Sequence, residues 1–227
     1  MTHSLQGFAR QRSSPNAVTS KRHKPWLGAS GSSQAGCVRR DSDEERMLKG
    51  KRVTLRRVTD EDWKQIEAWV DDRDALCGAY LRFQPELLSR LKEGYQKTGL
   101  FSRDKACLVI ETVEGKRPIG IVTYGPLAFP DQDMPVPEIG FAVADAAARG
   151  KGYAKEAVGL LVRHLYESSP TDRVMAVTEC ENVPSQRVLE ALGFRREGVL
   201  RRAMFRGGRW NDAFVYGLLR DEMKDGY

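Results

Sequence analysis

The segment that most constrains this chain covers residues 138–157, where an apolar run leads through a short loop into a helix that begins with two glycines. It reads E-I-G-F-A-V-A-D-A-A-A-R-G-K-G-Y-A-K-E-A. The apolar run predicts a strand over residues 138–144, and the spacing of Ala154, Ala157, Val158, Leu161 and Leu165 predicts an amphipathic helix over residues 152–168. The segment therefore favours an α/β protein with a strand–loop–helix at its centre.

The loop of this segment is suited to bind an anion. The first turn of a helix leaves backbone N–H groups unpaired, and the helix dipole adds positive potential there. Gly150 and Gly152 allow a ligand to approach the backbone, while Arg149 and Lys151 add flexible positive charge at the rim. By itself, the stretch Arg149–Ala154 is as typical of an ordinary helix start as it is of an anion-binding loop. Neither a Walker loop nor a dinucleotide-binding fingerprint is present in this stretch.

The rest of the regular pattern predicts the order β-α-α-β-β-β-α-β-α-β-β. Predicted helices cover residues 59–70, 85–96, 152–168 and 183–192, and Gly193 suits the left-handed position after the last of them. Predicted strands cover residues 53–56, 107–112, 119–124, 138–144, 173–178 and 213–219, with one more strand before the turn R-G-G-R-W-N-D.

The first 46 residues differ in composition from the rest of the chain. They are rich in Ser, Gly, Gln and Arg, and no acidic residue precedes Asp41. Such a stretch buries too little apolar surface to offset its chain entropy, so we expect a disordered basic tail at 1–46 and a folded domain at 47–227. Two alternatives stay open: an organelle transit peptide, and a natural start at Met47 that would leave the tail untranslated.

Composition excludes several function classes. Hydrophobic residues make up 41% of the chain and no apolar run is long enough to cross a membrane. Four widely spaced cysteines and three scattered histidines predict neither a disulfide framework, nor a metal site, nor a Ser-His-Asp triad. We therefore expect a cytoplasmic protein. The net charge of +6 favours anionic partners, although much of it lies in the tail.

Four motifs together resemble one family. They are R-G-K-G-Y-A followed by K-E-A, E-N-V-P-S-Q-R-V-L-E-A-L-G-F, the opening L-K-G-K-R-V-T-L-R-R-V, and the ending G-G-R-W-N-D-A-F-V-Y-G-L-L-R-D-E. In this order they resemble the GNAT superfamily, and within it the ribosomal-protein N-acetyltransferase-like (RimJ/RimL-type) group, over about residues 47–221. The resemblance implies the acyl-CoA N-acyltransferase fold, with a mixed central sheet flanked by helices.

The resemblance also implies a cofactor and the residues that bind it. The acyl donor would be acetyl-CoA. Backbone groups of Phe141, Ala142 and Val143 would pair with the pantetheine arm, and Asn182 would contact the same region. The pyrophosphate would bind the N–H groups of Arg149, Gly150, Lys151, Gly152, Tyr153 and Ala154.

Some of these residues have a structural interpretation as well. Asn182 could be only a helix N-cap, or a cap that also binds the ligand. Tyr153 could simply pack on the sheet. A lone serine is most often a solvated hydroxyl, but the N-x-x-S signature favours Ser185 beside the thioester sulfur, as the donor to the leaving thiolate.

Acetyl transfer to an amine also needs a base, because a lysine-type amine is protonated at neutral pH. Glu138 is the first candidate, acting through water, although a strand-end carboxylate can equally be a solvated edge. Glu111 is a weaker candidate, and an acidic loop at residues 131–133 could recognise a cationic acceptor. Cys180 could lie near the site, but a covalent cysteine mechanism needs an activating histidine.

The sequence therefore predicts an enzyme that transfers the acetyl group of acetyl-CoA to a primary amine of a small molecule or a protein N-terminus. The alternative is a non-catalytic sensor that binds acyl-CoA or a partner; Asn182 and Ser185 favour catalysis. A nucleic-acid-binding tail is a third interpretation, but only Phe8 and Trp26 accompany its basic residues. No metal is expected, and the sequence leaves a homodimer open.

Overall fold

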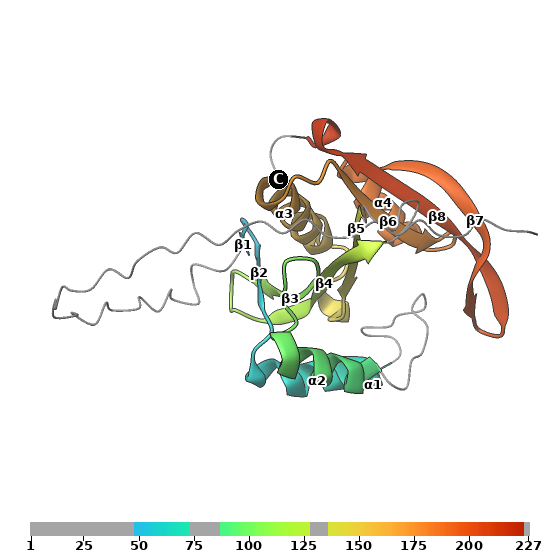
Figure 1. Cartoon of the computed structure of the whole chain (residues 1–227). Coiled ribbons are helices and arrows are strands. Elements are labelled where there is room, and N and C mark those ends of the chain that lie inside the picture. Colours follow the sequence, from blue (N-terminus) through green and yellow to red (C-terminus); the bar gives the residue numbers. More distant parts are fainter. Residues whose placement is uncertain (1–47, 73–86, 128–135, 225–227) are drawn as a thin grey trace, which may run out of the picture. The chain divides into compact units, whose positions relative to one another are not determined.

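The computed structural model describes residues 48–72, 87–127 and 136–224 (Figure 1). The predicted tail at 1–46, the acidic loop at 131–133 and the start of the predicted helix at 85–96 lie outside these ranges.

One mixed sheet of eight strands forms the centre, in the order β1-β2-β3-β4-β5-β6-β8-β7. All neighbours are antiparallel except β5 and β6, which run parallel. The mixed sheet flanked by helices is therefore confirmed. The strands are β1 (Leu48–Lys49), β2 (Val53–Arg57), β3 (Ala106–Thr112), β4 (Pro118–Leu127), β5 (Val136–Val143), β6 (Arg173–Glu179), β7 (Arg195–Arg206) and β8 (Arg209–Leu219).

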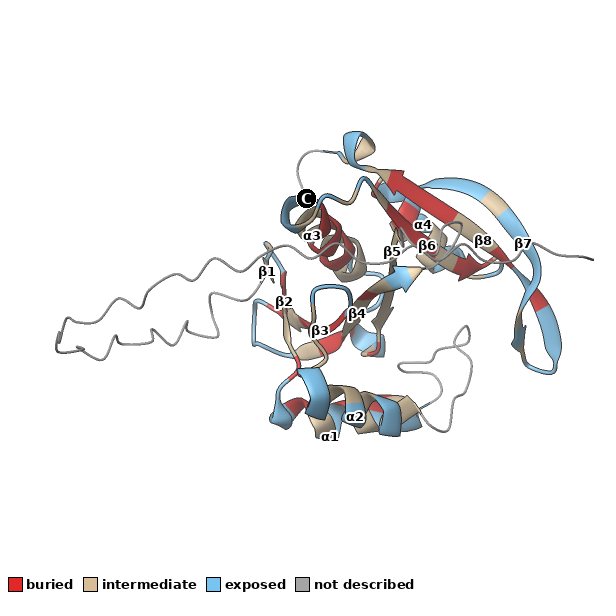
Figure 2. Cartoon of the chain, in the orientation of Figure 1, coloured by how far each residue is buried: buried red, intermediate tan, exposed pale blue. Residues whose placement is uncertain are grey.

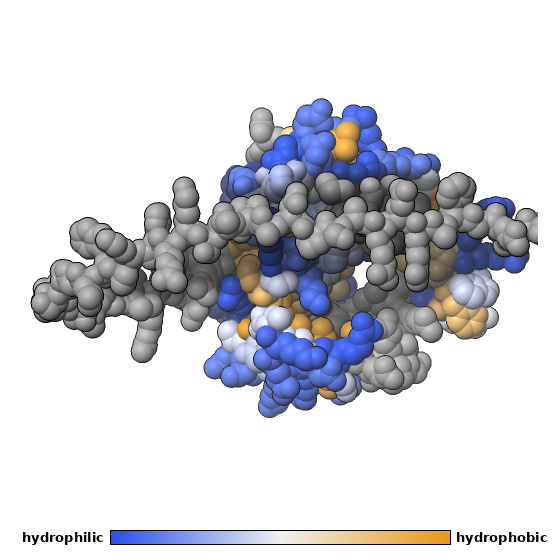
Figure 3. Space-filling model, in the orientation of Figure 1, coloured by the Kyte–Doolittle hydropathy of each residue, from blue (hydrophilic) through white to orange (hydrophobic). Residues whose placement is uncertain are grey.

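Helices cover both faces of the sheet (Figure 1). The helices α1 (Trp63–Asp71) and α2 (Leu87–Thr98) lie against one face, and α3 (Tyr153–Ser168) and α4 (Val183–Ala191) lie on the other. Their outward surfaces are polar, as the space-filling view shows for α1 and α2 (Figure 3). In α3, Ala157, Val158, Leu161 and Leu165 of the predicted apolar stripe are buried, so this stripe sets the face that the helix turns to the sheet (Figure 2).

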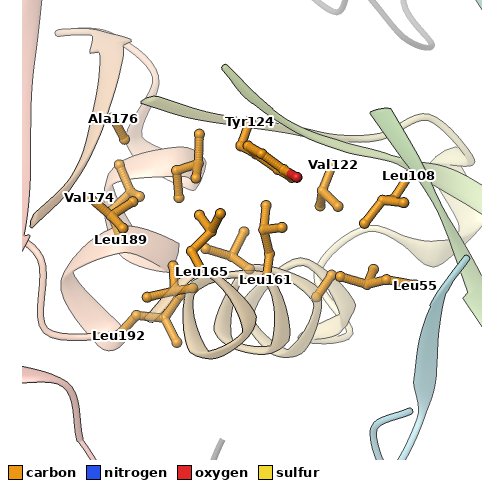
Figure 4. Packing of buried hydrophobic residues seen from close by; sticks show 14 of the residues in the cluster. Leu55, Leu108, Val122, Tyr124, Leu161, Leu165, Val174, Ala176, Leu189 and Leu192 are labelled. Carbon is orange, nitrogen blue, oxygen red and sulfur yellow. The ribbon is translucent and has the colours of Figure 1, made fainter. Parts of the chain in front are cut away.

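The larger core lies between the sheet and α3. Leu161 and Leu165 of α3 point toward the sheet, where Val122, Tyr124 and other buried side chains belong to the same cluster (Figure 4). Leu161 and Val122 have no exposed surface. A smaller core joins Trp69 and Ile66 of α1 to Val109 of β3 on the opposite face. The sheet is thus buried on both faces near its middle, and this packing holds the strands beside β5 and β6 in place.

The structure differs from the sequence prediction at several element boundaries; for example, α1 begins at Trp63 and β4 continues to Leu127. The short strand β1 was not predicted, because two residues carry no periodic signal. The final turn is shorter than the predicted R-G-G-R-W-N-D, since Trp210 and Asn211 already pair with Phe205 and Met204 across the β7–β8 hairpin. Helix α2 continues past residue 96 to Thr98. The left-handed residue after α4 is confirmed, with Gly193 at φ 97°.

Candidate active site

The two parallel strands share a single register position. Glu138 of β5 lies opposite Met175 of β6, whereas β5 pairs with β4 along its whole length from Val136 to Val143. Residues 139–143 of β5 therefore have no strand partner on the β6 side among the described elements. Backbone N–H and C=O groups along such an edge can pair with an extended ligand.

The carboxyl ends of β5 and β6 lie at the same edge of the sheet because the strands are parallel. The strand β5 leads into the glycine loop and α3, and β6 leads through Cys180 and Glu181 into Asn182 and α4. In parallel α/β arrangements, ligands bind beyond the carboxyl ends of the strands. The fold thus places the two predicted motifs, which are about thirty residues apart in sequence, at one edge.

The glycine loop requires glycine at two positions. Gly150 has φ 72° and Gly152 has φ 80°, both in the left-handed region, and Gly152 is the residue immediately before α3. A side chain at position 152 would also lie 3.0 Å from Arg52 Nη2. A short 3₁₀ turn at Ala146–Ala148 precedes the loop, where Asp145 accepts a hydrogen bond from the N–H of Ala147. The first N–H groups of α3 thus follow an exposed turn.

Arg149 differs from the expectation of a flexible charge at the rim. Its Nε donates to the carbonyl of Val143 at 2.9 Å, and Nη2 donates to the carbonyl of Ala144 at 3.2 Å. The side chain therefore connects the loop to the end of β5, and its charge is held in place. Lys151 is exposed, whereas Tyr153 packs against the core beneath the sheet.

A second arginine holds the other side of the loop. Arg52 donates from Nη1 to the carbonyl of Lys151 at 2.7 Å and from Nη2 to the carbonyl of Gly152 at 3.2 Å. Its Nε and its backbone N–H both bind the carboxylate of Glu156, at 3.0 and 2.7 Å. The start of the domain is thus bonded directly to the first turn of α3.

At the start of α4, Asn182 acts as the N-cap. Its Oδ1 accepts a hydrogen bond from the N–H of Ser185 at 3.2 Å, and Pro184 occupies the first turn. The capping interpretation is therefore confirmed, while the amide nitrogen of Asn182 takes no part in this bond. Ser185 is half-buried, and within the described part of the chain its hydroxyl forms no hydrogen bond, so it can donate to a ligand.

Glu138 is half-buried at the point where β5 meets β6. Burial raises the pKa of its carboxyl group. By strand alternation it lies on the same face as Ala142, which packs against the smaller core with α1. A carboxylate whose pKa is raised, and which lies beside an unpaired strand edge, can accept the proton that a protonated amine loses before it attacks.

A match to a protein family decides which family this chain belongs to. Residues 52–195 match the family model described as the acetyltransferase (GNAT) domain. The chain is a GNAT acetyltransferase. The family predicted from the four motifs is confirmed.

One curated relative and two solved structures are matched to this acetyltransferase over almost their full length. It is 26% identical over 178 residues to the uncharacterized N-acetyltransferase YnaD of Bacillus subtilis, covering 76% of this chain and 96% of the relative. In fold it is similar to a ribosomal-protein-S5-alanine acetyltransferase from Vibrio fischeri, with a TM-score of 0.61, 23% identity and coverage of 78% and 98%. A spermidine N-acetyltransferase from Vibrio cholerae, solved with CoA and spermine, has a TM-score of 0.63 at 21% identity, covering 75% and 96%.

Two further candidate residues lose support in the acetyltransferase. The Glu111 carboxylate accepts from Arg56 Nε at 2.6 Å, and Arg56 also binds Asp62 at 2.7 and 2.9 Å. Glu111 is thus engaged in a structural ion-pair network and is poorly placed to accept a proton. Cys180 is a free thiol whose pKa is raised by burial, which disfavours the nucleophilic thiolate.

The sequence-based prediction missed Arg52 and Glu156 as residues of this site. Arg52 lies within the family-like opening L-K-G-K-R-V, and Glu156 within K-E-A, but nothing in the sequence pairs positions 104 residues apart.

Within the three described ranges, no cluster of three or more His, Cys, Asp or Glu side chains is suited to a metal ion. No helix in the same ranges is long and apolar enough to span a membrane.

Proposed function

We propose that this acetyltransferase uses acetyl-CoA as donor, bound along the free edge of β5, and that its acceptor is a primary amine of a small molecule or a protein N-terminus. One observation supports this most directly. After Glu138 and Met175, β5 has no strand partner on the β6 side among the described elements, and this edge leads straight into the glycine loop. An extended arm ending in a pyrophosphate matches that combination of an open strand edge and a helix N-terminus.

In this proposal the cofactor interacts mainly with the backbone. Phe141, Ala142 and Val143 offer strand-like hydrogen bonds to the pantetheine arm, and Asn182 contacts it from α4. The pyrophosphate accepts hydrogen bonds from the N–H groups of the loop and first turn of α3, residues 149–154. The spermidine N-acetyltransferase from Vibrio cholerae was solved in complex with CoA, which agrees with this donor for a protein of the same fold.

The proposed chemistry uses two side chains and one backbone group. Glu138, through a water molecule, accepts the proton that makes the amine nucleophilic. The nitrogen then bonds to the thioester carbon while a backbone N–H of residues 141–143 stabilises the developing oxyanion. As the carbon–sulfur bond breaks, the Ser185 hydroxyl gives its proton to the thiolate, which ends as a thiol, and takes the second proton from the nitrogen, which ends as a neutral amide.

The same proposal covers the domains, the compartment and the partners. The catalytic domain occupies residues 47–227 and residues 1–46 form a separate tail, in agreement with the family match from residue 52. The protein works in the cytoplasm, where free thiols such as Cys107 and Cys180 persist. Its partners are acetyl-CoA and the amine.

Release of free CoA thiol by the full-length chain tests the function. Acetyl-CoA would be supplied with N-terminal peptides, polyamines, aminoglycosides and small amines, each with a no-acceptor control. Thiol release that requires one acceptor class, with a matching acetylated product by mass spectrometry, supports the proposal and identifies the acceptor. Acetyl-CoA binding without transfer to any class of amine would favour the sensor alternative.

A further inference from the structure

The segment that joins β1 to β2 reaches across the sheet edge to the first turn of α3. Arg52, in this segment, uses all three of its guanidinium nitrogens there. Nη1 and Nη2 donate to the carbonyls of Lys151 and Gly152, and Nε donates to Glu156. Every one of these bonds ends on the loop or the first turn of α3, so the loop conformation depends on a residue about 100 positions earlier.

Glu156 presents an electrostatic problem for an anion site. A carboxylate in the first turn of a helix is stabilised by the helix dipole, but it repels a second anion at the same N-terminus. The Glu156 carboxylate accepts hydrogen bonds from the backbone N–H groups of Arg52 and Val53 and from the Arg52 guanidinium. Burial alone would raise the pKa of Glu156, but these three donors outweigh burial and lower it, so the group is charged and compensated.

The chain also leaves room for this carboxylate. A Cβ atom at Gly50 would lie 2.4 Å from Glu156 Oε1 and 2.9 Å from Leu160 Cδ1. The N–H of Gly50 donates to the carbonyl of Val53 at 2.9 Å and closes the turn that contains Arg52. The Arg52 guanidinium additionally lies 5.4 Å from the ring centroid of Tyr153, the first residue of α3.

We propose that Arg52 and Glu156 form a positioning pair for the pyrophosphate site: Glu156 orients Arg52, and Arg52 holds the carbonyls of Lys151 and Gly152 away from the phosphates so that the loop N–H groups face them. This role rests on the proposed function. In this role, Arg52 in the family-like opening of the domain contributes to the affinity for CoA. Neither Arg52 nor Glu156 touches the reacting atoms.

The competing arrangement is a direct contact of Arg52 with a phosphate. The positioning role and the direct contact predict opposite changes in CoA affinity for Glu156→Gln. If Glu156 orients Arg52, then Glu156→Gln weakens CoA binding. If Arg52 binds phosphate directly, Glu156 only neutralises it, and Glu156→Gln strengthens binding by removing a nearby negative charge.

The test is isothermal titration of CoA into the full-length wild type, Arg52→Leu and Glu156→Gln, with melting temperatures measured alongside. Lys92→Leu, which breaks the exposed Lys92–Glu67 ion pair between α1 and α2, is the matched control. We expect the dissociation constant to rise about tenfold in Arg52→Leu, and less but in the same direction in Glu156→Gln. The control should bind as the wild type does.

S-acetylpantetheine, which ends before the pyrophosphate, separates positioning from general damage. Its KM should be the same in wild type and Arg52→Leu, because it does not use the loop. Equal CoA affinity in wild type and both variants, tighter binding by Glu156→Gln, or parallel losses with S-acetylpantetheine would each overturn the positioning role. A wild-type chain that binds no CoA would instead refute the proposed function, and the positioning role with it.

Discussion

Glu138 of β5 lies opposite Met175 of β6 at the one register position that these parallel strands share. This pairing anchors β5 to the second half of the sheet just before its edge becomes free. It also places a half-buried carboxyl at that point, with a pKa raised by burial. The same residue thus marks the end of the parallel pairing and the proposed start of the proton path.

The first prediction concerns Glu138 as the base. Glu138→Gln should lower kcat about 100-fold to 10,000-fold, because the amide cannot accept the proton, while CoA affinity stays unchanged. In the wild type only the ionised carboxylate is active, so kcat should rise with pH through a pKa above the ordinary glutamate value, and the variant should lose this limb. Steady-state rates from pH 5 to 9 measure both effects. Glu167→Gln, an exposed change on α3, is the control; a variant with wild-type kcat would remove Glu138 from the mechanism.

A second prediction concerns the Ser185 hydroxyl. Ser185→Ala should reduce kcat about 100-fold by leaving the departing thiolate without a donor. The cap of α4 should persist, because Asn182 binds the backbone N–H of Ser185 and not its side chain. Turnover and CoA titration together are the measurement. Loss of affinity at unchanged turnover would assign Ser185 to binding.

The third prediction tests the left-handed glycine before α3. Gly152→Val should abolish CoA binding, since the side chain crowds the loop and meets Arg52, and the left-handed backbone costs about 1–2 kcal/mol. Gly115→Val is a matched control, because Gly115 has φ 77° in the β3–β4 turn with open space around it. Both variants should lose stability in urea through the left-handed backbone, but only Gly152→Val should lose binding. Normal CoA affinity in Gly152→Val would refute the placement of the pyrophosphate.

A fourth prediction concerns the ion pair of half-buried Arg56 and buried Asp62, which connects β2 to the turn before α1. Asp62→Asn should destabilise the fold by about 1.5–3 kcal/mol, because it weakens hydrogen bonds between charged groups while Arg56 keeps its bond to Glu111. Burial opposes ionisation of Asp62, but Arg56 and the N–H of Thr59 outweigh it and lower the pKa.

The pH dependence of this stability has a definite sign. A lowered folded-state pKa contributes stability that is present above the unfolded pKa and is lost as the pH falls through the folded one. Urea midpoints should therefore converge between wild type and Asp62→Asn as the pH drops below the ordinary aspartate value. A difference in urea midpoint between wild type and Asp62→Asn that stays constant down to pH 2 would contradict this account.

The sequence determined the elements and the family. The apolar periods of α3 and β6, the left-handed Gly193 and the four motifs all depend on neighbours within a few residues, which a sequence displays directly. Local signals also identified Asn182 as a cap, because capping involves the next three residues. The same signals failed for β1, which is too short to show a period, and for the β7–β8 turn, where Trp210 and Asn211 read as turn residues but pair across the hairpin.

Only the tertiary structure decided which charged residues are available for chemistry. Glu138 and, more weakly, Glu111 were both candidate bases in the sequence, but Glu111 is bound by Arg56 while Glu138 lies where β5 meets β6. Arg149 looked like a free cation, yet it binds the end of β5. Arg52 and Glu156 gave no signal, since their contact spans 104 positions and forms only when β2 packs beside α3. Hydrogen bonds of this kind depend on positions a few ångströms apart in space, and such proximity is set by the packing of the whole sheet.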